Sequence, residues 1–216
     1  MKRSTRLDRW TDLKANEVPL AAVALVAAAS SILALILHAL GWLRMPYAVS
    51  FLTVPGLAVL LMVMAYAGRG DYRVLRNRLL VGSAAGLIGL IPYDLGRLLL
   101  ILLVPLSFDP FAPIAGFGTF ITGQPPDAAV TLVAGWAYHI SNGWTFGVAY
   151  ALIFGPARWW WGLIWGLVLE IGMILVYPVI FSNLRVGPFL LVSIIGHAVF
   201  GATLGAWCRR YAIRGG

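Results

Sequence analysis

Residues 159–181 read WWWGLIWGLVLEIGMILVYPVIF, an unbroken apolar run in which Glu170 is the only charged residue. A membrane-spanning helix needs roughly 20 mostly apolar residues, whereas a barrel strand is shorter and alternates between apolar and polar positions. The run therefore predicts a transmembrane helix. A carboxyl group inside such a helix is costly and is by default a functional-site hypothesis, so the same stretch also singles out Glu170.

Five further runs of this kind surround the first one. The six predicted spans are Leu20–Leu40, Tyr47–Tyr66, Leu79–Val104, Ala128–Phe154, Trp159–Phe181 and Phe189–Trp207. The composition agrees, because 61% of the 216 residues are hydrophobic, 11% are charged and the mean hydropathy is +0.88, whereas a soluble domain carries about 25% charged residues. We therefore predict an all-α integral membrane protein with six transmembrane helices.

The basic residues predict how these helices are oriented. Thirteen of the sixteen Lys and Arg residues fall in the N-terminal arm, the second loop, the fourth loop and the tail, while the other loops hold only Arg44 and Arg185. Because basic loops stay in the cytoplasm, both termini are predicted to be cytoplasmic in a bacterial-type plasma (inner) membrane. The predicted organisation is a basic arm at 1–18, a membrane domain at 19–208 and a basic tail at 209–216.

The same distribution explains the net charge of +8 as a topology signal. No basic folded domain suited to nucleic acid and no nucleotide-binding loop is present. We therefore expect membrane lipids as partners, and neither nucleic acid nor nucleotide. Nothing in the sequence indicates an oligomeric state.

The last four spans contain a candidate internal repeat. The stretch from His139 to Gly147 aligns with the stretch from His197 to Gly205 in the pattern H-x3-G-x-T-x-G, and Asp94-Leu-Gly aligns with Glu170-Ile-Gly. This pattern predicts repeat A at about 79–154 and repeat B at about 159–208. Two parallel repeats would make helices three to six a pseudo-twofold four-helix bundle of two tandem hairpins.

Each of these four spans also carries two glycines four residues apart. They are Gly82 and Gly86, Gly143 and Gly147, Gly162 and Gly166, and Gly201 and Gly205. Small residues at this spacing let helix backbones approach closely in lipid, so we expect tight helix packing in the cytoplasmic half of the bundle.

Four ionisable residues lie at a common predicted depth, namely Asp94, His139, Glu170 and His197. At 1.5 Å per residue each is about 15 Å from the outer surface, near the middle of the hydrocarbon core. Two imidazoles and two carboxylates suit a divalent transition metal such as Zn, Fe or Mn. The first hypothesis is therefore a metal-dependent membrane enzyme that acts on a lipid or other apolar substrate reached from the outer half of the bilayer. In it Glu170 is the general base, Asn142 orients a ligand or water, and His38 is an accessory ligand.

Three alternatives use the same residues differently. A small transporter or channel would use the acids and imidazoles to relay protons or ions. A bis-histidine haem b carrier would bind iron between His139 and His197, which leaves the carboxylates without a role. In a structural role, Asp94 would pair with Arg97 on one helical face, and each histidine would hydrogen-bond a carboxylate and lock helices together.

The longest external loop, 105–127, contains four phenylalanines and five of the chain's prolines but no Lys or Arg. An aromatic loop of this kind is expected to fold back onto the bundle, either as a lid over a cavity or as an interfacial segment. Its Phe117 is a candidate contact for a lipid or substrate, as are the outer arginines Arg44 and Arg185.

Overall fold

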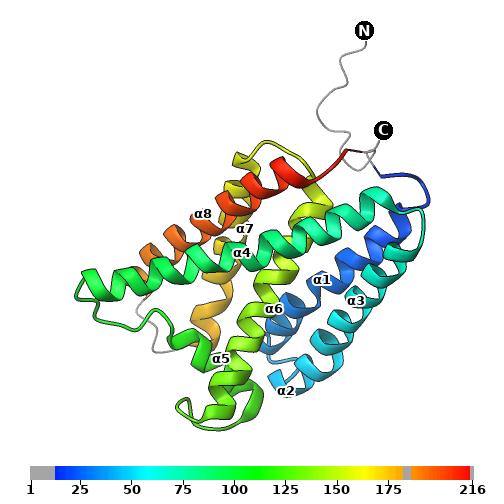
Figure 1. Cartoon of the computed structure of the whole chain (residues 1–216). Helices are drawn as coiled ribbons and strands as arrows, with labels where there is room; N and C mark the ends of the chain where they lie inside the picture. The colour runs from blue at the N-terminus through cyan, green and yellow to red at the C-terminus, as the bar shows by residue number, and fades with distance from the viewer. Residues whose placement is uncertain (1–12, 182–185, 215–216) are drawn as a thin grey trace.

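The computed structural model describes residues 13–181 and 186–214, and all regular structure in this part of the chain is helical (Figure 1). The helices are α1 (Val18–Ala39), α2 (Met45–Ala48), α3 (Val54–Arg69), α4 (Arg73–Leu103), α5 (Ala112–Thr122), α6 (Ala129–Phe154), α7 (Trp160–Ile180) and α8 (Val186–Tyr211). A π-helical turn, Val49–Thr53, joins α2 to α3. The prediction of an all-α protein is confirmed for the described residues.

Five stretches of the described chain are long and apolar enough to cross a membrane. They are Val18–Ala39, Met45–Arg69, Arg73–Leu103, Trp160–Ile180 and Phe189–Tyr211. The remaining predicted span, Ala128–Phe154, corresponds to α6, which has 26 residues but is less apolar, because residues such as Trp136, His139, Ser141 and Asn142 interrupt it. The protein therefore has the character of a multi-pass membrane protein with five clear candidate spans.

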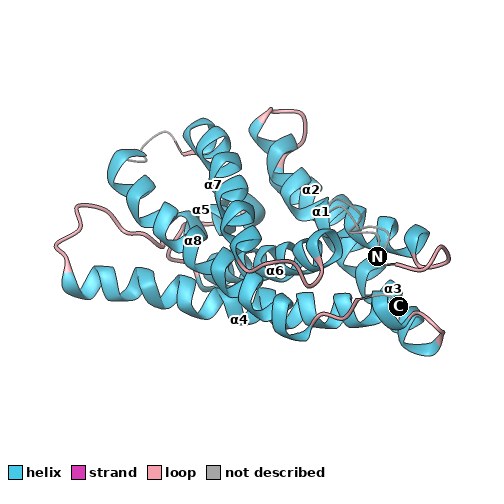
Figure 2. Ribbon diagram, turned by 90° about the horizontal axis from the view of Figure 1, so that it is seen from above, coloured by secondary structure: helices cyan, strands magenta, loops and turns pink. Residues whose placement is uncertain are grey.

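Helix α6 lies in the middle of the molecule, with the α7–α8 hairpin on one side and α1 and α3 on the other (Figure 1; Figure 2). Its glycines face those of α4: a Cβ atom on Gly82 would lie 2.7 Å from the carbonyl oxygen of Gly147, and one on Gly86 would collide with Gly143. Since neither contact leaves room for a methyl group, only glycine permits this approach of the two backbones.

The α7–α8 hairpin is built in the same way. A Cβ atom on Gly162 would collide with the carbonyl oxygen of Gly201, and one on Gly166 would collide with that of His197. The expectation that the paired glycines lie where helices approach closely is therefore met in both hairpins. These crossings fix how α6 faces α4 and how α8 faces α7, and they place the ionisable residues of each helix pair side by side.

Four chain segments meet at one end of the bundle. The Glu17 carboxylate accepts hydrogen bonds from the backbone N–H groups of Val74 and Leu75 (3.0 and 3.1 Å), so it satisfies free donors at the start of α4. Asn77 donates to the carbonyl of Tyr211 (3.2 Å), and Arg78 donates to that of Leu152 (3.3 Å). The starts of α1 and α4 and the ends of α6 and α8 therefore share this end, which we call the basic end for the arginines around it.

The predicted aromatic loop contains a helix, α5, that packs against the start of α6. A Cβ atom on Gly118 would collide with the backbone of Thr131, and one on Gly135 with the carbonyl of Ile114. Phe117 is buried and its ring contacts those of Tyr138 and Tyr177, with centroids 5.4 and 5.7 Å apart. The loop thus folds back onto the bundle, as expected for so apolar a segment, at the end opposite the basic end.

Candidate functional site

The first ionisable pair joins α4 to α6. Asp94 Oδ2 lies 3.0 Å from His139 Nε2, and the other carboxylate oxygen lies 3.6 Å from Nη1 of Arg97, one turn further along α4. The Arg97 side chain is only 6% exposed and that of Asp94 22%. A buried guanidinium needs an anion close by, and Asp94 is the acid that lies beside Arg97.

The second pair joins α7 to α8. Glu170 Oε2 lies 2.6 Å from His197 Nδ1 and also accepts a hydrogen bond from the Ser193 hydroxyl (2.8 Å). Glu170 is 2% exposed, and its Oε1 atom has no hydrogen-bond partner among the described residues. No arginine or lysine of the described chain forms an ion pair with it. Among the described residues, Glu170 and His197 are thus each other's partner for balancing charge.

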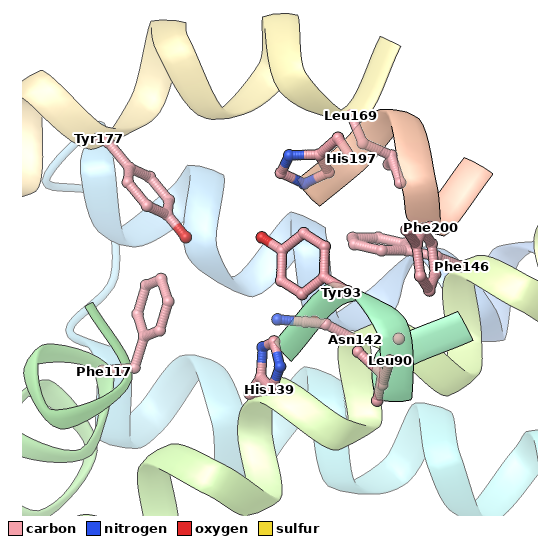
Figure 3. A pocket seen from close by; sticks show the side chains of 11 residues that line it. Leu90, Tyr93, Phe117, His139, Asn142, Phe146, Leu169, Tyr177, His197 and Phe200 are labelled. Carbon is pink, nitrogen blue, oxygen red and sulfur yellow. The ribbon is translucent and has the colours of Figure 1, made fainter. Parts of the chain in front are cut away.

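Tyr93 lies between the two pairs. Its ring centroid is 5.9 Å from that of His139 and 5.3 Å from that of His197. Arg97 donates a hydrogen bond to the Tyr93 hydroxyl, and its guanidinium lies 4.2 Å from the Tyr93 ring centroid. Figure 3 shows Tyr93 between the two imidazoles, with its hydroxyl directed towards that of Tyr177. The side chain of Tyr93 thus contacts both His139 and His197.

These side chains surround a small cavity of about 70 Å³. Its polar lining is Tyr93, His139, Asn142, Tyr177 and His197, and its apolar lining includes Phe117 and Phe146 (Figure 3). A water needs only about 10–15 Å³ of such volume and two to four polar partners, so the cavity has room for a few waters. The polar groups inside the bundle therefore face a space that can be hydrated.

Asn142 connects this cavity to α1. Its side-chain oxygen accepts a hydrogen bond from the Ser31 hydroxyl, and the Tyr138 hydroxyl donates to the Ser31 carbonyl (2.8 Å). Ser31 was not among the predicted site residues, although the two adjacent serines Ser30 and Ser31 in the middle of an apolar run were a signal in the sequence.

The predicted convergence of Asp94, His139, Glu170 and His197 within coordination distance is wrong. Each acid pairs with the histidine of its own hairpin, and the Tyr93 ring fills the space between the pairs. Within residues 13–181 and 186–214, no group of three or more His, Cys, Asp or Glu side chains could hold a metal ion. Tyr93 also occupies the space that an iron bound to both imidazoles would need.

The remaining predicted contacts lie elsewhere. His38 packs its ring against Phe120, with centroids 5.0 Å apart, and lines with Arg44 a separate depression of about 330 Å³ at the C-terminal end of α1. The role of accessory ligand required His38 to lie beside the two pairs, and it does not lie there. Phe117 does line the central cavity. Arg185 lies outside the described residues.

The two cofactor predictions, a divalent transition metal and haem b, stay predictions. Analysis of the purified protein for metal and haem tests both of them. Because a protein site for such a metal usually supplies at least three ligands, we expect little bound metal, equal in the wild type and in the H139A and H197A variants, and no haem absorbance. The test is elemental mass spectrometry and an absorbance spectrum of the purified proteins. About one equivalent of metal, lost in either variant, would contradict this expectation and favour the metal-dependent enzyme.

Comparison with known proteins gives one match. A family of unknown function (DUF6789) matches residues 76–215, a range that runs from the start of α4 through α8 and includes both pairs and Tyr93. The match does not include α1 with Ser31. No curated protein and no solved structure matches the chain.

Proposed function

The chain belongs to the DUF6789 family, whose function is unknown, and from its site we propose that it is a small membrane transporter or channel that relays protons. One observation carries the proposal: two carboxylate–imidazole pairs flank one tyrosine beside a cavity inside a bundle of apolar helices. Ionisable groups at membrane depth are rare because they are expensive, and proton relays are one of the uses that retain them.

The Glu170–His197 pair is the proposed proton-accepting step. One proton can lie on the carboxyl group or on the imidazole without changing the net charge of the pair. His197 Nδ1 faces Glu170, while its Nε2 atom has no hydrogen-bond partner among the described residues and the ring lines the cavity. An imidazole takes up a proton at one nitrogen and releases one at the other. His197 would thus pass protons between the cavity and Glu170.

The Asp94–His139 pair has a different role in this proposal. Arg97 forms an ion pair with Asp94, and the contact of Asp94 with His139 holds the imidazole in a fixed orientation. A proton that leaves His197 would pass next to the Tyr93 hydroxyl or to Nδ1 of His139, the ring nitrogen that does not face Asp94. Arg97 donates a hydrogen bond to that hydroxyl and so fixes its position beside both histidines.

Removing the Tyr93 hydroxyl tests the link between the two pairs. We expect Y93F to lower proton flux severalfold in vesicles that contain the purified protein, because the phenyl ring still packs but has no hydroxyl to carry a proton. Y66F, which changes an exposed tyrosine at the end of α3, is the control and should leave the flux unchanged. Equal flux in wild type and Y93F would remove Tyr93 from the relay.

We also propose that α6 is a sixth span, with both termini in the cytoplasm of a bacterial-type inner membrane. At 1.5 Å per residue its 26 residues extend about 39 Å, enough to cross the hydrocarbon core. It packs antiparallel to α4 from the Gly82–Gly147 contact to the Asp94–His139 pair. Its two ends lie at the basic end and beside α5, at the same two ends as the other long helices.

Reporter fusions test this topology. Fusions after Gly70 and Gly155 should read as cytoplasmic, and one after Gly123 as external, because six spans leave the start of α6 outside and its end inside. Paired reporters that are active on opposite sides of the membrane make the measurement. A cytoplasmic signal after Gly123 would contradict the six-span arrangement.

The internal repeat belongs to the same proposal. The α4–α6 and α7–α8 hairpins each contain one acid–histidine pair and one glycine crossing, and the Gly86–Gly143 contact corresponds by alignment to the Gly162–Gly201 contact. The correspondence has one difference, since His139 uses Nε2 towards its acid and His197 uses Nδ1. It supports a duplicated hairpin whose second copy lacks the arginine at the position of Arg97.

A further inference from the structure

The basic end carries a depression of about 360 Å³ that the proton relay does not use. It lies between the turn that joins α3 to α4 and the C-terminal tail, and its lining includes Arg73, Arg76, Asn77, Leu80 and Ile213. The tail is fixed there by the Asn77 side chain, which accepts a hydrogen bond from the Ile213 backbone (2.8 Å) and donates to the Tyr211 carbonyl (3.2 Å). The depression is therefore built by two segments far apart in sequence.

The charge of this depression is positive. Arg73 and Arg76 are exposed and lie three residues apart on one face of α4, and neither forms an ion pair with another described residue. The one acid in the lining, Asp71, is 3.1 Å from the Lys14 ammonium group, which balances its charge. Two guanidinium groups thus remain to attract an anion, and guanidinium is well suited to bind phosphate oxygens.

An apolar track continues from the depression along the same face of α4. Leu80 is 50% exposed, Leu87 45% and Ile91 64%, and their spacing from Arg76 is that of one helical face. From Leu80 to Ile91 the helix rises about 16 Å, close to half of the roughly 30 Å hydrocarbon core. The length of the track therefore matches one leaflet.

We propose that this surface is a binding site for an anionic phospholipid of the leaflet at the basic end. The phosphate group lies between Arg73 and Arg76, and an acyl chain lies along Leu80, Leu87 and Ile91. A free phosphate would use the arginines alone, whereas the apolar track below them has a role only for a lipid. The inference does not depend on the proton relay.

Lipid retention measured by native mass spectrometry of the full chain tests this site. In mixed micelles of phosphatidylglycerol and phosphatidylcholine with the same acyl chains, the wild type should retain phosphatidylglycerol preferentially. R73Q and R76Q should each weaken that retention about fivefold, the effect expected of one basic residue near an anionic lipid surface. The R158Q variant removes the same charge from an exposed arginine outside the depression, so it should retain the lipid as the wild type does.

Three results would overturn the proposal. Equal retention of the two lipids by the wild type would show that the charge does not select a ligand. An equal loss in R158Q would show that the whole basic end attracts anionic lipid without a site. Displacement of phosphatidylglycerol by millimolar inorganic phosphate would show that the site binds the phosphate group only.

Discussion

Alanine in place of Gly162 is expected to destabilise the protein by about 3 kcal/mol or more, whereas alanine in place of Gly172 on the same helix is expected to have little effect. A Cβ atom on Gly162 would overlap the carbonyl oxygen of Gly201, while nothing lies within 4 Å of one on Gly172. Overpacking a core usually costs about 1–3 kcal/mol, and a collision with backbone is worse because no side chain can turn aside.

The control substitution, G172A, is expected to favour the helix rather than disrupt it. In a helix interior glycine is about 1 kcal/mol less favourable than alanine, so G172A should keep or slightly raise the unfolding temperature. The pair G86A and G96A repeats the comparison on α4, because a Cβ atom on Gly86 would meet the backbone of Gly143 while nothing lies within 4 Å of one on Gly96. Thermal unfolding of the purified proteins in one detergent measures all four variants. Equal unfolding temperatures for G162A and G172A would contradict the close crossing of α7 and α8.

This crossing matters for the site because it fixes the distance between the two helices that carry Glu170 and His197. A separation of α7 and α8 by the width of a methyl group would break the 2.6 Å contact between Oε2 and Nδ1. We therefore expect G162A to lose proton flux together with stability, and G172A to lose neither.

The ionisable residues of the site could be found from the sequence because apolar helices contain so few of them. Ionisable side chains inside apolar runs single out four residues, namely Asp94, His139, Glu170 and His197. The predicted repeat already assigns one acid and one histidine to each hairpin. The Asp94–Arg97 contact also follows from their spacing of three residues. The sequence pattern alone therefore predicts which helix carries each ionisable residue and how far along that helix the residue lies.

The relation between the two pairs could not be predicted. Whether four side chains meet at one point depends on the rotation of each helix and on what fills the centre, and Tyr93 fills it. The contact between Ser31 and Asn142 joins residues 111 positions apart, which no local pattern encodes. Helix α6 is not among the five clear candidate spans, and its polar residues include His139 and Asn142, which line the cavity.

Loss of the Glu170 carboxylate is expected to have the largest effect on function. E170Q keeps the shape of the side chain and can still accept from Ser193, but it cannot take up a proton from His197. Removing a group that transfers protons typically costs at least about a hundredfold in rate, so flux through the variant should fall to the level of protein-free vesicles. The D127N variant changes an exposed carboxylate in the loop before α6 and should behave as the wild type.

The decisive measurement is the decay of an imposed pH difference across vesicles that contain the purified protein, followed with an enclosed pH-sensitive dye. The proton-relay account predicts fast decay for wild type and D127N, and decay at the protein-free rate for E170Q at an unchanged unfolding temperature. The account would be contradicted if wild-type vesicles held the pH difference as long as protein-free ones, or if E170Q vesicles lost it as fast as wild type. The two acid–histidine pairs would then have only the structural role of holding helices together.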